Sequence, residues 1–103
     1  MAQRYVSGEF EATGQSGDNA AGDAPEFQGE FNLTISGTFV ATVRLERSFD
    51  GGSTWHPCTR SDGGARQWTA PISIVVREPE DGVEYRLNCT AFTSGTVDYR
   101  LSQ

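Results

Sequence analysis

Apolar and polar residues alternate with a period of two from Phe27 almost to the end of this chain. Phe31, Leu33 and Ile35 share one face, and a second alternating run, 39–45, follows the turn at Ser36-Gly37. A period of two is that of a half-buried β-strand, and no segment shows the helical period. Further strands are expected at 55–59, 66–68, 72–77, 83–92 and 96–101. The clusters that separate them, 50–53, 61–64, 78–82 and 93–95, contain the glycine, aspartate, serine and proline of turns. The pattern predicts an all-β domain, an antiparallel β-sandwich or small barrel of seven or eight strands.

The cluster Thr93-Ser94-Gly95 allows a register to be predicted for the last two strands. A three-residue loop with glycine in the left-handed position keeps apolar residues opposite each other. The expected pairs are Ala91 with Val97, Cys89 with Tyr99 and Leu87 with Leu101. The other face would then set Thr90 against Asp98 and Asn88 against Arg100, with Arg44 and Glu46 near by. That face is either a solvated, charge-paired surface or a polar subunit contact.

The first 26 residues differ from the rest of the chain. Residues 11–26 contain no large apolar side chain, so a flexible loop or arm tip is expected there. Before this loop, Tyr5, Val6 and Phe10 suit either a short strand or a tail that anchors on a neighbouring subunit. The chain is thus divided into an N-terminal arm or short strand with its loop, 1–26, and one β-sandwich domain, 27–103.

Residues 48–55 fit the Asp-box pattern S-x-D-x-G-x-x-W, with Ser48, Asp50, Gly52 and Trp55 at the defined positions. The aspartate is expected to accept hydrogen bonds from backbone amides of the turn, and glycine to supply a positive φ. The tryptophan is expected to fold back over the hairpin. In sialidases this box recurs once per propeller blade, but 103 residues cannot hold a propeller of four or more blades. The box therefore predicts a structural hairpin, not a sialidase.

Charge and residue usage exclude several classes of function. The net charge of −6 argues against binding to nucleic acid. All eight basic residues are arginine, which excludes a Schiff-base lysine and the lysine of a P-loop. No run of apolar residues is long enough to span a membrane, and none resembles a secretory signal, so synthesis in a cytoplasm is expected. Cys58 and Cys89 could form one disulfide, but reduced and mostly buried thiols are the favoured interpretation.

The sequence also lacks the residues of a typical catalytic or metal site. His56 is the single histidine, and a packed or exposed role is expected for it. Cys58 would act as a nucleophile only with a base such as His56 beside it and an oxyanion site. We therefore expect no enzyme, no cofactor and no metal. Trp68 is the most plausible surface aromatic, either an interface anchor, which we favour, or part of a sugar-binding platform with Trp55 and Tyr5.

Four segments, 31–38, 41–52, 82–87 and 93–102, together resemble the core of small β-sandwich virion proteins of tailed bacteriophages, encoded among head and tail genes. The resemblance implies a structural protein on the capsid surface of the virion, synthesised in the bacterial host cytoplasm. Its expected role is that of a capsid decoration (cement) protein, which contacts the major capsid protein and forms homo-oligomers. The candidate interface residues are Tyr5, Val6, Phe10 and Trp68. The alternative is a carbohydrate-binding or adhesion module of a tail or head fibre, with a glycan held by Trp68, Tyr5 and Arg60 or Arg66.

Overall fold

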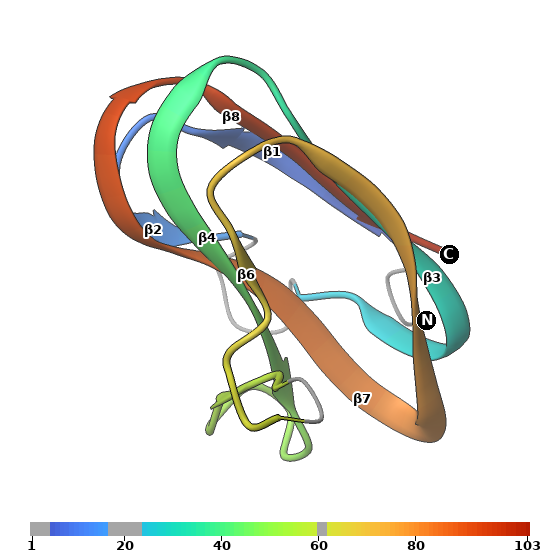
Figure 1. Cartoon of the computed structure of the whole chain (residues 1–103). Coiled ribbons are helices and arrows are strands. Elements are labelled where there is room, and N and C mark those ends of the chain that lie inside the picture. Colours follow the sequence, from blue (N-terminus) through green and yellow to red (C-terminus); the bar gives the residue numbers. More distant parts are fainter. Residues whose placement is uncertain (1–4, 17–23, 60–61) are drawn as a thin grey trace.

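A computed structural model of the chain describes residues 5–16, 24–59 and 62–103 (Figure 1). Within these residues the fold is all-β, as predicted, with eight strands in one antiparallel sheet and no helix. The strands are β1 (Tyr5–Phe10), β2 (Gly14–Gln15), β3 (Glu26–Ser36), β4 (Phe39–Ser48), β5 (His56–Pro57), β6 (Gln67–Trp68), β7 (Ile72–Gly95) and β8 (Val97–Ser102). The sheet curls back on itself, so that its inner face encloses the core, as expected for a small sandwich or barrel (Figure 1).

The centre of the sheet is one long two-stranded ribbon that bends at a corner. On one side of the corner β3 pairs with β8, ending with Ser36 opposite Asp98. On the other side β4 pairs with the second half of β7, beginning with Phe39 opposite Gly95. Gly95 has a φ of 92°, and a Cβ there would overlap the carbonyl oxygen of Thr38. The corner therefore requires glycine at position 95, because any side chain would push the two strands apart.

The predicted hairpin between the last two strands is wrong. Strand β8 does not pair with β7 but lies between β1 and β3, with Leu101 opposite both Val6 and Leu33. Asn88 pairs with Arg44 of β4 and not with Arg100. The left-handed glycine is present at Gly95, but it carries the chain around the corner of the ribbon instead of reversing it. The sequence correctly predicts a left-handed glycine at position 95, but pairing with strands that are distant in the sequence determines the path of the chain after it.

The predicted inward faces are confirmed for most strands even though their partners differ. Ala91, expected to face inward with Leu87 and Cys89, is exposed, because the pairing with β4 shifts register between Thr42 and Val43 and Phe92 packs against the core instead. Phe31, Leu33 and Ile35 of β3 are buried. On β4 Ala41, Val43 and Leu45 are buried and Phe39 is partly buried. The other buried apolar residues are Val6, Phe10, Phe27, Ala41, Val43, Leu45, Val76, Val83, Tyr85, Leu87, Cys89, Val97 and Leu101. Phe27, Phe31 and Tyr85 form an aromatic cluster, with ring centroids 4.3 Å apart for the first pair and 4.6 Å for the Phe31–Tyr85 pair. This core is the product of alternation, which places one face of every strand inside.

The N-terminal residues belong to the same sheet. Of the two alternatives for Tyr5, Val6 and Phe10, the structure shows the short strand, because β1 pairs along its whole length with β8. Strand β2 pairs with β7, and the Ser16 hydroxyl accepts a hydrogen bond of 2.8 Å from the Leu87 amide. The sandwich thus includes 5–16, and the boundary expected at residue 26 falls inside the fold, at the start of β3. The loop predicted for 11–26 lies in part outside the described residues, at 17–23.

The first half of β7 forms an edge of the sheet. Residues 72–78 pair with β3 on one side, from Ile72 opposite Ile35 to Glu78 opposite Gly29. Among the described residues no strand pairs with their other side, since β4 and β2 meet β7 only from Glu84 onward. Residues 79–82 then bulge out before β7 turns into the second half of the ribbon. This edge positions the site described next.

Candidate functional site

The Asp box forms a hairpin loop between β4 and β5, as predicted. Strand β5 returns along β4, with His56 opposite Arg47. The Ser48 hydroxyl donates to Asp50 Oδ1 at 2.8 Å and accepts from the Gly52 amide at 2.9 Å. Asp50 Oδ1 also accepts from the Thr54 amide at 2.9 Å, and these contacts, the Thr54 amide first, lower the Asp50 pKa to about 2. Gly52 takes the positive φ expected of it, 96°.

Trp55 ends the box and packs on the sheet. Its ring is half-buried and lies under the guanidinium of Arg86, 4.4 Å from the ring centroid. A Cβ at Gly52 would come within 3.7 Å of the same ring. All four predicted residues of the box therefore lie together at one end of the sandwich, where they hold the loop rather than line a reaction site.

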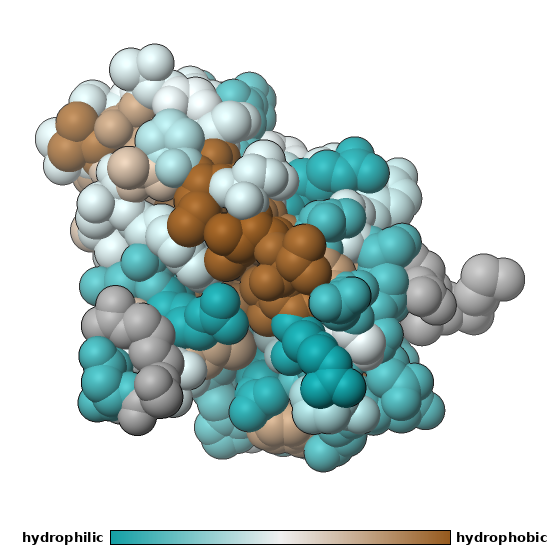
Figure 2. All heavy atoms as spheres, turned by 45° about the vertical axis from the view of Figure 1, so that its right-hand side comes forward, coloured by the Kyte–Doolittle hydropathy of each residue, from teal (hydrophilic) through white to brown (hydrophobic). Residues whose placement is uncertain are grey.

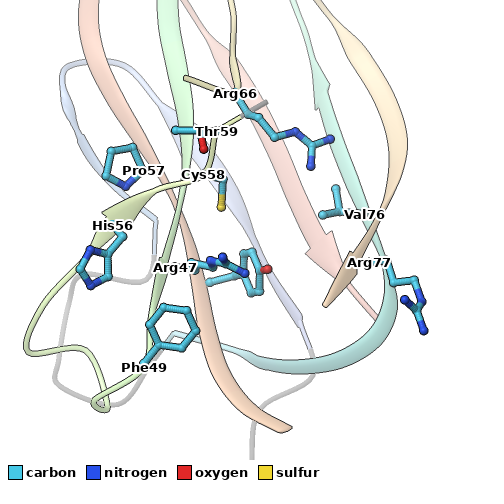
Figure 3. A pocket seen from close by; sticks show the side chains of 10 residues that line it. Arg47, Phe49, His56, Pro57, Cys58, Thr59, Arg66, Val76 and Arg77 are labelled. Atoms are coloured by element: carbon cyan, nitrogen blue, oxygen red, sulfur yellow. The ribbon is translucent and has the colours of Figure 1, made fainter. Parts of the chain in front are cut away.

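An open pocket of about 310 Å³ lies beside the Asp box (Figure 3). One wall is the edge half of β7, with Val76 and Arg77, and the other is the stretch from β5 toward β6, with Cys58 and Arg66. Arg47 forms its floor, and Phe49 and His56 stand at the end nearest the box (Figure 3). Tyr85 also lines the pocket. The pocket is thus the place where the curled sheet stays open between two of its edges.

A buried carboxylate fixes the floor of this pocket. Glu78, 2% exposed, accepts hydrogen bonds from the Tyr85 hydroxyl at 2.6 Å and from Arg47 at 2.7 Å. Burial tends to raise the pKa of Glu78, but the hydrogen bonds from Tyr85, the Glu80 amide and Arg47 outweigh it and lower the pKa. Burial first, and then the bond to Glu78, raise the pKa of Tyr85. The charge of Arg47 is therefore neutralised by the buried carboxylate of Glu78 and is not available to a ligand.

Two other arginines of the pocket form no ion pair with another described residue. Arg66 and Arg77 have no ion pair and no side-chain hydrogen bond to the described residues. By contrast Arg44, Arg47 and Arg86 each meet a carboxylate. Arg77 is exposed and lies opposite Glu30 of β3, whereas Arg66 is half-buried on the other wall of the pocket, so the two guanidinium groups do not form one isolated positive site.

Cys58 and His56, the one nucleophile–base pair noted in the sequence, both line the pocket but do not form an activated pair. His56 is exposed, with its ring centroid 5.9 Å from that of Phe49. Burial raises the pKa of the Cys58 thiol to about 11, although Arg47 and Arg66 act in the opposite direction. A thiol with this pKa is almost wholly protonated at neutral pH and is a poor nucleophile. Cys58 and Cys89 are both free thiols in this structure.

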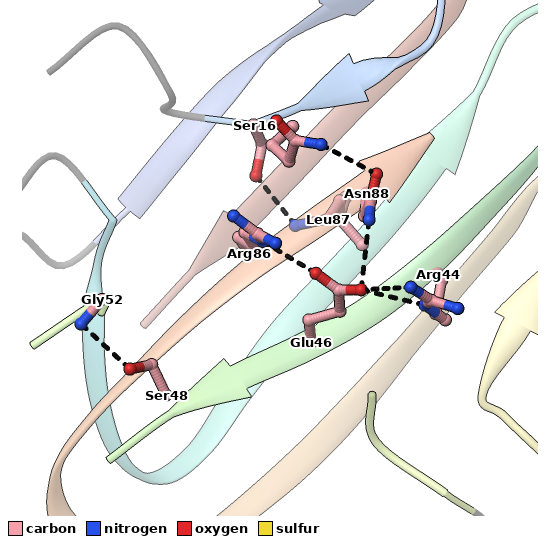
Figure 4. A network of polar contacts seen from close by, with 9 residues as sticks. Ser16, Arg44, Glu46, Ser48, Gly52, Arg86, Leu87 and Asn88 are labelled. Carbon is pink, nitrogen blue, oxygen red and sulfur yellow. Dashed lines mark hydrogen bonds and ion pairs between the residues drawn. The ribbon is translucent and has the colours of Figure 1, made fainter. Parts of the chain in front are cut away.

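The polar face predicted near Asn88 is built around Glu46 (Figure 4). This carboxylate, 3% exposed, accepts from Arg44 at 2.6 and 3.0 Å, from Arg86 at 2.7 Å and from Asn88 at 3.1 Å. Burial tends to raise the pKa of Glu46, but the hydrogen bonds from Asn88, Arg86 and Arg44 outweigh it and lower the pKa. Gln15 of β2 extends the network to Asn88 at 3.2 Å. The network therefore ties β2 and β4 to β7, and its groups are satisfied within the chain.

The structure separates the four predicted interface residues. Val6 and Phe10 are 8% and 5% exposed in the chain's own core, so they have little surface to offer a partner. Tyr5 is 55% exposed, with Arg100 over its ring, and Trp68 is half-buried against the core. Tyr5 pairs with Ser102 at one end of the strand order, whereas Trp68 pairs with Val43 near the other. Tyr5 and Trp68 therefore lie on two strands, β1 and β6, that do not pair with each other, and Arg60 lies outside the described residues.

Sequence reasoning missed the most exposed apolar residue of the edge. Val75 of β7 is 59% exposed, and Ile72 and Ile74 beside it are only partly buried. Figure 2 shows a band of hydrophobic surface on the side of the molecule where this half of β7 comes forward. The run Ile74-Val75-Val76 breaks the alternation of apolar and polar residues, and this break in the sequence indicates that an apolar side chain lies on the outer face.

No family model, curated protein or solved structure matches this chain. Within the described residues, no group of three or more histidine, cysteine, aspartate or glutamate side chains is placed to hold a metal ion. The same residues contain no helix that is long and apolar enough to cross a membrane. The candidate site is therefore defined by the chain's own geometry, as an apolar sheet edge next to a pocket lined by Arg47, Arg66 and Arg77.

Proposed function

We propose that this chain is a structural virion protein of a tailed phage, a capsid decoration protein that stabilises the head through protein–protein contacts. The observation that supports this most is the uncovered edge of β7, where Val75 is 59% exposed and no strand of the described chain covers the backbone. Exposed apolar surface next to a sheet edge is typical of an interaction site. Contacts of this kind, repeated over the many equivalent positions of a shell, would add to its stability.

The chemistry of the pocket supports binding rather than catalysis. The raised pKa of Cys58 leaves little thiolate at neutral pH, and the His56 ring lies tilted against Phe49, with the ring centroids 5.9 Å apart. The arginine on the floor is already held by Glu78. What remains open is an apolar wall and two guanidinium groups, which can recognise a partner but supply no nucleophile.

The carbohydrate-binding alternative has weaker support. A stacking platform needs aromatic rings on one exposed surface, but Tyr5 and Trp68 lie on β1 and β6, which do not pair with each other, and Trp68 is only partly exposed. Trp68 is packed against the core, which suits an anchor beside an interface better than a sugar platform.

The test compares phage particles with and without the protein. Particles that lack it are expected to lose DNA at a lower temperature and lower salt than complete particles, and the protein is expected in many copies over the shell. Complementation with Val75→Lys is expected to restore the particles poorly. Val40→Lys is the control for a lysine added to exposed apolar surface elsewhere, because Val40 is 58% exposed but lies on β4, opposite Ser94 and outside segment 72–77. Particles that are equally stable without the protein would refute the cement role, and glycan binding that is lost in Trp68→Ala would favour the alternative.

A further inference from the structure

Glu84 of β7 is a buried carboxylate without a partner. It is 8% exposed, yet it forms no hydrogen bond and no ion pair with another described residue. Glu46 and Glu78, the other buried carboxylates of the described chain, each accept several hydrogen bonds. Burial without a hydrogen-bond donor disfavours the charged form of a carboxylate. Glu84 is therefore placed where a proton would be bound more readily than in water.

Two other carboxylates act on Glu84. Glu26 of β3 lies directly opposite it in the sheet. The Tyr85 amide donates a hydrogen bond of 3.0 Å to the Pro25 carbonyl, one residue beyond this pair on each strand, so Glu26 and Glu84 form a non-hydrogen-bonded pair. Side chains stand closest together in pairs of this kind. Burial is the first cause that raises the pKa of Glu84, and the charges of Glu26 and Asp50 add to it.

The other groups around Glu84 do not compensate its charge. Ser48 lies opposite it on β4, but its hydroxyl is engaged within the Asp box. Arg86, two residues along on the same face of β7, is bound to Glu46 at 2.7 Å (Figure 4). The backbone of Gly52 covers the group, since a Cβ there would lie 3.2 Å from Glu84 Oε1. Glu84 is thus enclosed between β3, β4 and the Asp box without a counterion among the described residues.

A single proton would satisfy this arrangement. A protonated Glu84 has an O–H that can donate to Glu26, which is within reach as its cross-strand neighbour. The Glu26 carboxylate makes no hydrogen bond or ion pair with another described residue, so it is free to accept. Asp50 is less suited, because its Oδ1 already accepts from Ser48 and Thr54. Hydrogen bonds from a carboxylic acid to a carboxylate are short and strong.

We propose that Glu26 and Glu84 form a proton-binding pair that tightens the junction of β3, β7 and the Asp box when the pH falls into the mildly acidic range. At neutral pH both groups are charged and repel each other; in the acidic range Glu84 holds the proton and donates it to Glu26 in a hydrogen bond. This inference does not depend on the proposed assembly function.

The direction of the pH dependence follows from the pKa of Glu84. Its folded-state pKa lies above the ordinary value of 4.5, so between the two values the folded chain holds a proton that the unfolded chain releases. Stability from this pair therefore rises as the pH falls through the raised pKa and is complete near 4.5. Glu46 and Glu78 act in the opposite direction, but only as the pH falls below 4.5 through their lowered pKa values.

The test follows the carboxyl carbons of Glu26 and Glu84 by NMR in the whole chain, titrated from pH 7 to pH 4. Glu84 is expected to titrate with a midpoint above 4.5, and the Glu26 resonance is expected to move in the same step. The Tyr85 amide reports on the junction, because it donates to the Pro25 carbonyl beside the pair. Its protection factor, corrected for the intrinsic pH dependence of exchange, is expected to rise about threefold between pH 7 and pH 5.

Two variants separate the pair from burial and from net charge. Glu26→Gln is expected to lower the Glu84 midpoint by about half a pH unit, the contribution of a like-charged cross-strand pair, and to remove most of the rise in Tyr85 protection. Glu30→Gln is the matched control, because Glu30 lies on the same strand but opposite Arg77, and it should leave both unchanged.

Three results would overturn the proposal. These are a Glu84 midpoint at or below 4.5, a Tyr85 protection factor that does not rise as the pH falls, and equal effects of Glu26→Gln and Glu30→Gln on the Glu84 midpoint. The first two are measured on the wild-type chain, so they decide the question even if a variant does not fold.

Discussion

Replacement of Glu46 by glutamine tests whether the polar network, and not only the apolar core, holds the ribbon together. Glutamine keeps the shape of the side chain but removes its charge and turns one acceptor into a donor. In its better orientation the amide oxygen takes the place of Oε2 and keeps Arg44 and Asn88. The amide nitrogen then faces Arg86 Nε, which now donates at 2.7 Å to Oε1.

The cost follows from these contacts. One charge-assisted hydrogen bond is lost, which is about 1.5–3 kcal/mol. The attraction of the carboxylate for two arginines, which are 30% and 21% exposed, is lost as well. Because both are partly solvated, we expect a total of about 2–4 kcal/mol, below the cost of breaking a fully buried pair. For a domain of this size that corresponds to a fall in Tm of roughly 10–25 °C.

Urea unfolding of wild type and Glu46→Gln as a function of pH is the assay. The folded-state pKa of Glu46 lies below its ordinary value of 4.5, so its stabilisation is complete above that value and is lost as the pH falls through the lowered pKa. The difference between the two proteins should therefore be largest at neutral pH and shrink under acid conditions. Glu78, whose pKa is also lowered, keeps part of the pH dependence in the variant.

Glu11→Gln is the control, because Glu11 is exposed and lies outside the strands. It should change the free energy of unfolding by less than about 0.5 kcal/mol. If Glu46→Gln is no more destabilising than Glu11→Gln, or if its effect is the same at pH 3 as at pH 7, the ionised Glu46 network does not stabilise the fold.

Two further substitutions test other contacts of the sheet. Glu84→Gln should stabilise the protein by about 0.5 kcal/mol at pH 7, because Glu84 lies directly opposite Glu26. Burial first, and then Glu26 and Asp50, raise the Glu84 pKa, so the gain in stability should vanish as the pH falls through that pKa. Urea unfolding of wild type and Glu84→Gln at pH 7 and pH 4 checks this. A variant that is less stable than wild type at pH 7 would contradict it. Gly95→Ala should cost more than about 2 kcal/mol in a thermal melt, because its Cβ would also lie 2.6 Å from Phe39 Cα. Gly51→Ala, with φ 78° and open space around it, should cost only about 1 kcal/mol, and equal costs would contradict the close approach at the corner.

The candidate site was only partly visible in the sequence. The Asp box could be predicted directly, because its hydrogen bonds join residues no more than four positions apart. The pocket could not, because Arg47, Arg66 and Arg77 come from three separate parts of the chain. The sequence allows Val6 and Phe10 to lie either in an arm that contacts a partner or in a strand of the domain, because both need an apolar segment. Only the pairing with β8 decides for the strand.

Alternation by itself determined which side of most strands faces the core, since the period of two is a local property of an extended backbone. Leu87, Cys89, Val97 and Leu101 are buried as their pattern requires, although the hairpin predicted between them does not form. The tertiary structure alone decided the neighbours of each strand. An inward face can be buried against any strand with a matching face, and the choice among them depends on how the whole sheet closes. For this reason Gly95 marks a corner rather than a hairpin, and the first half of β7 is left as an open edge.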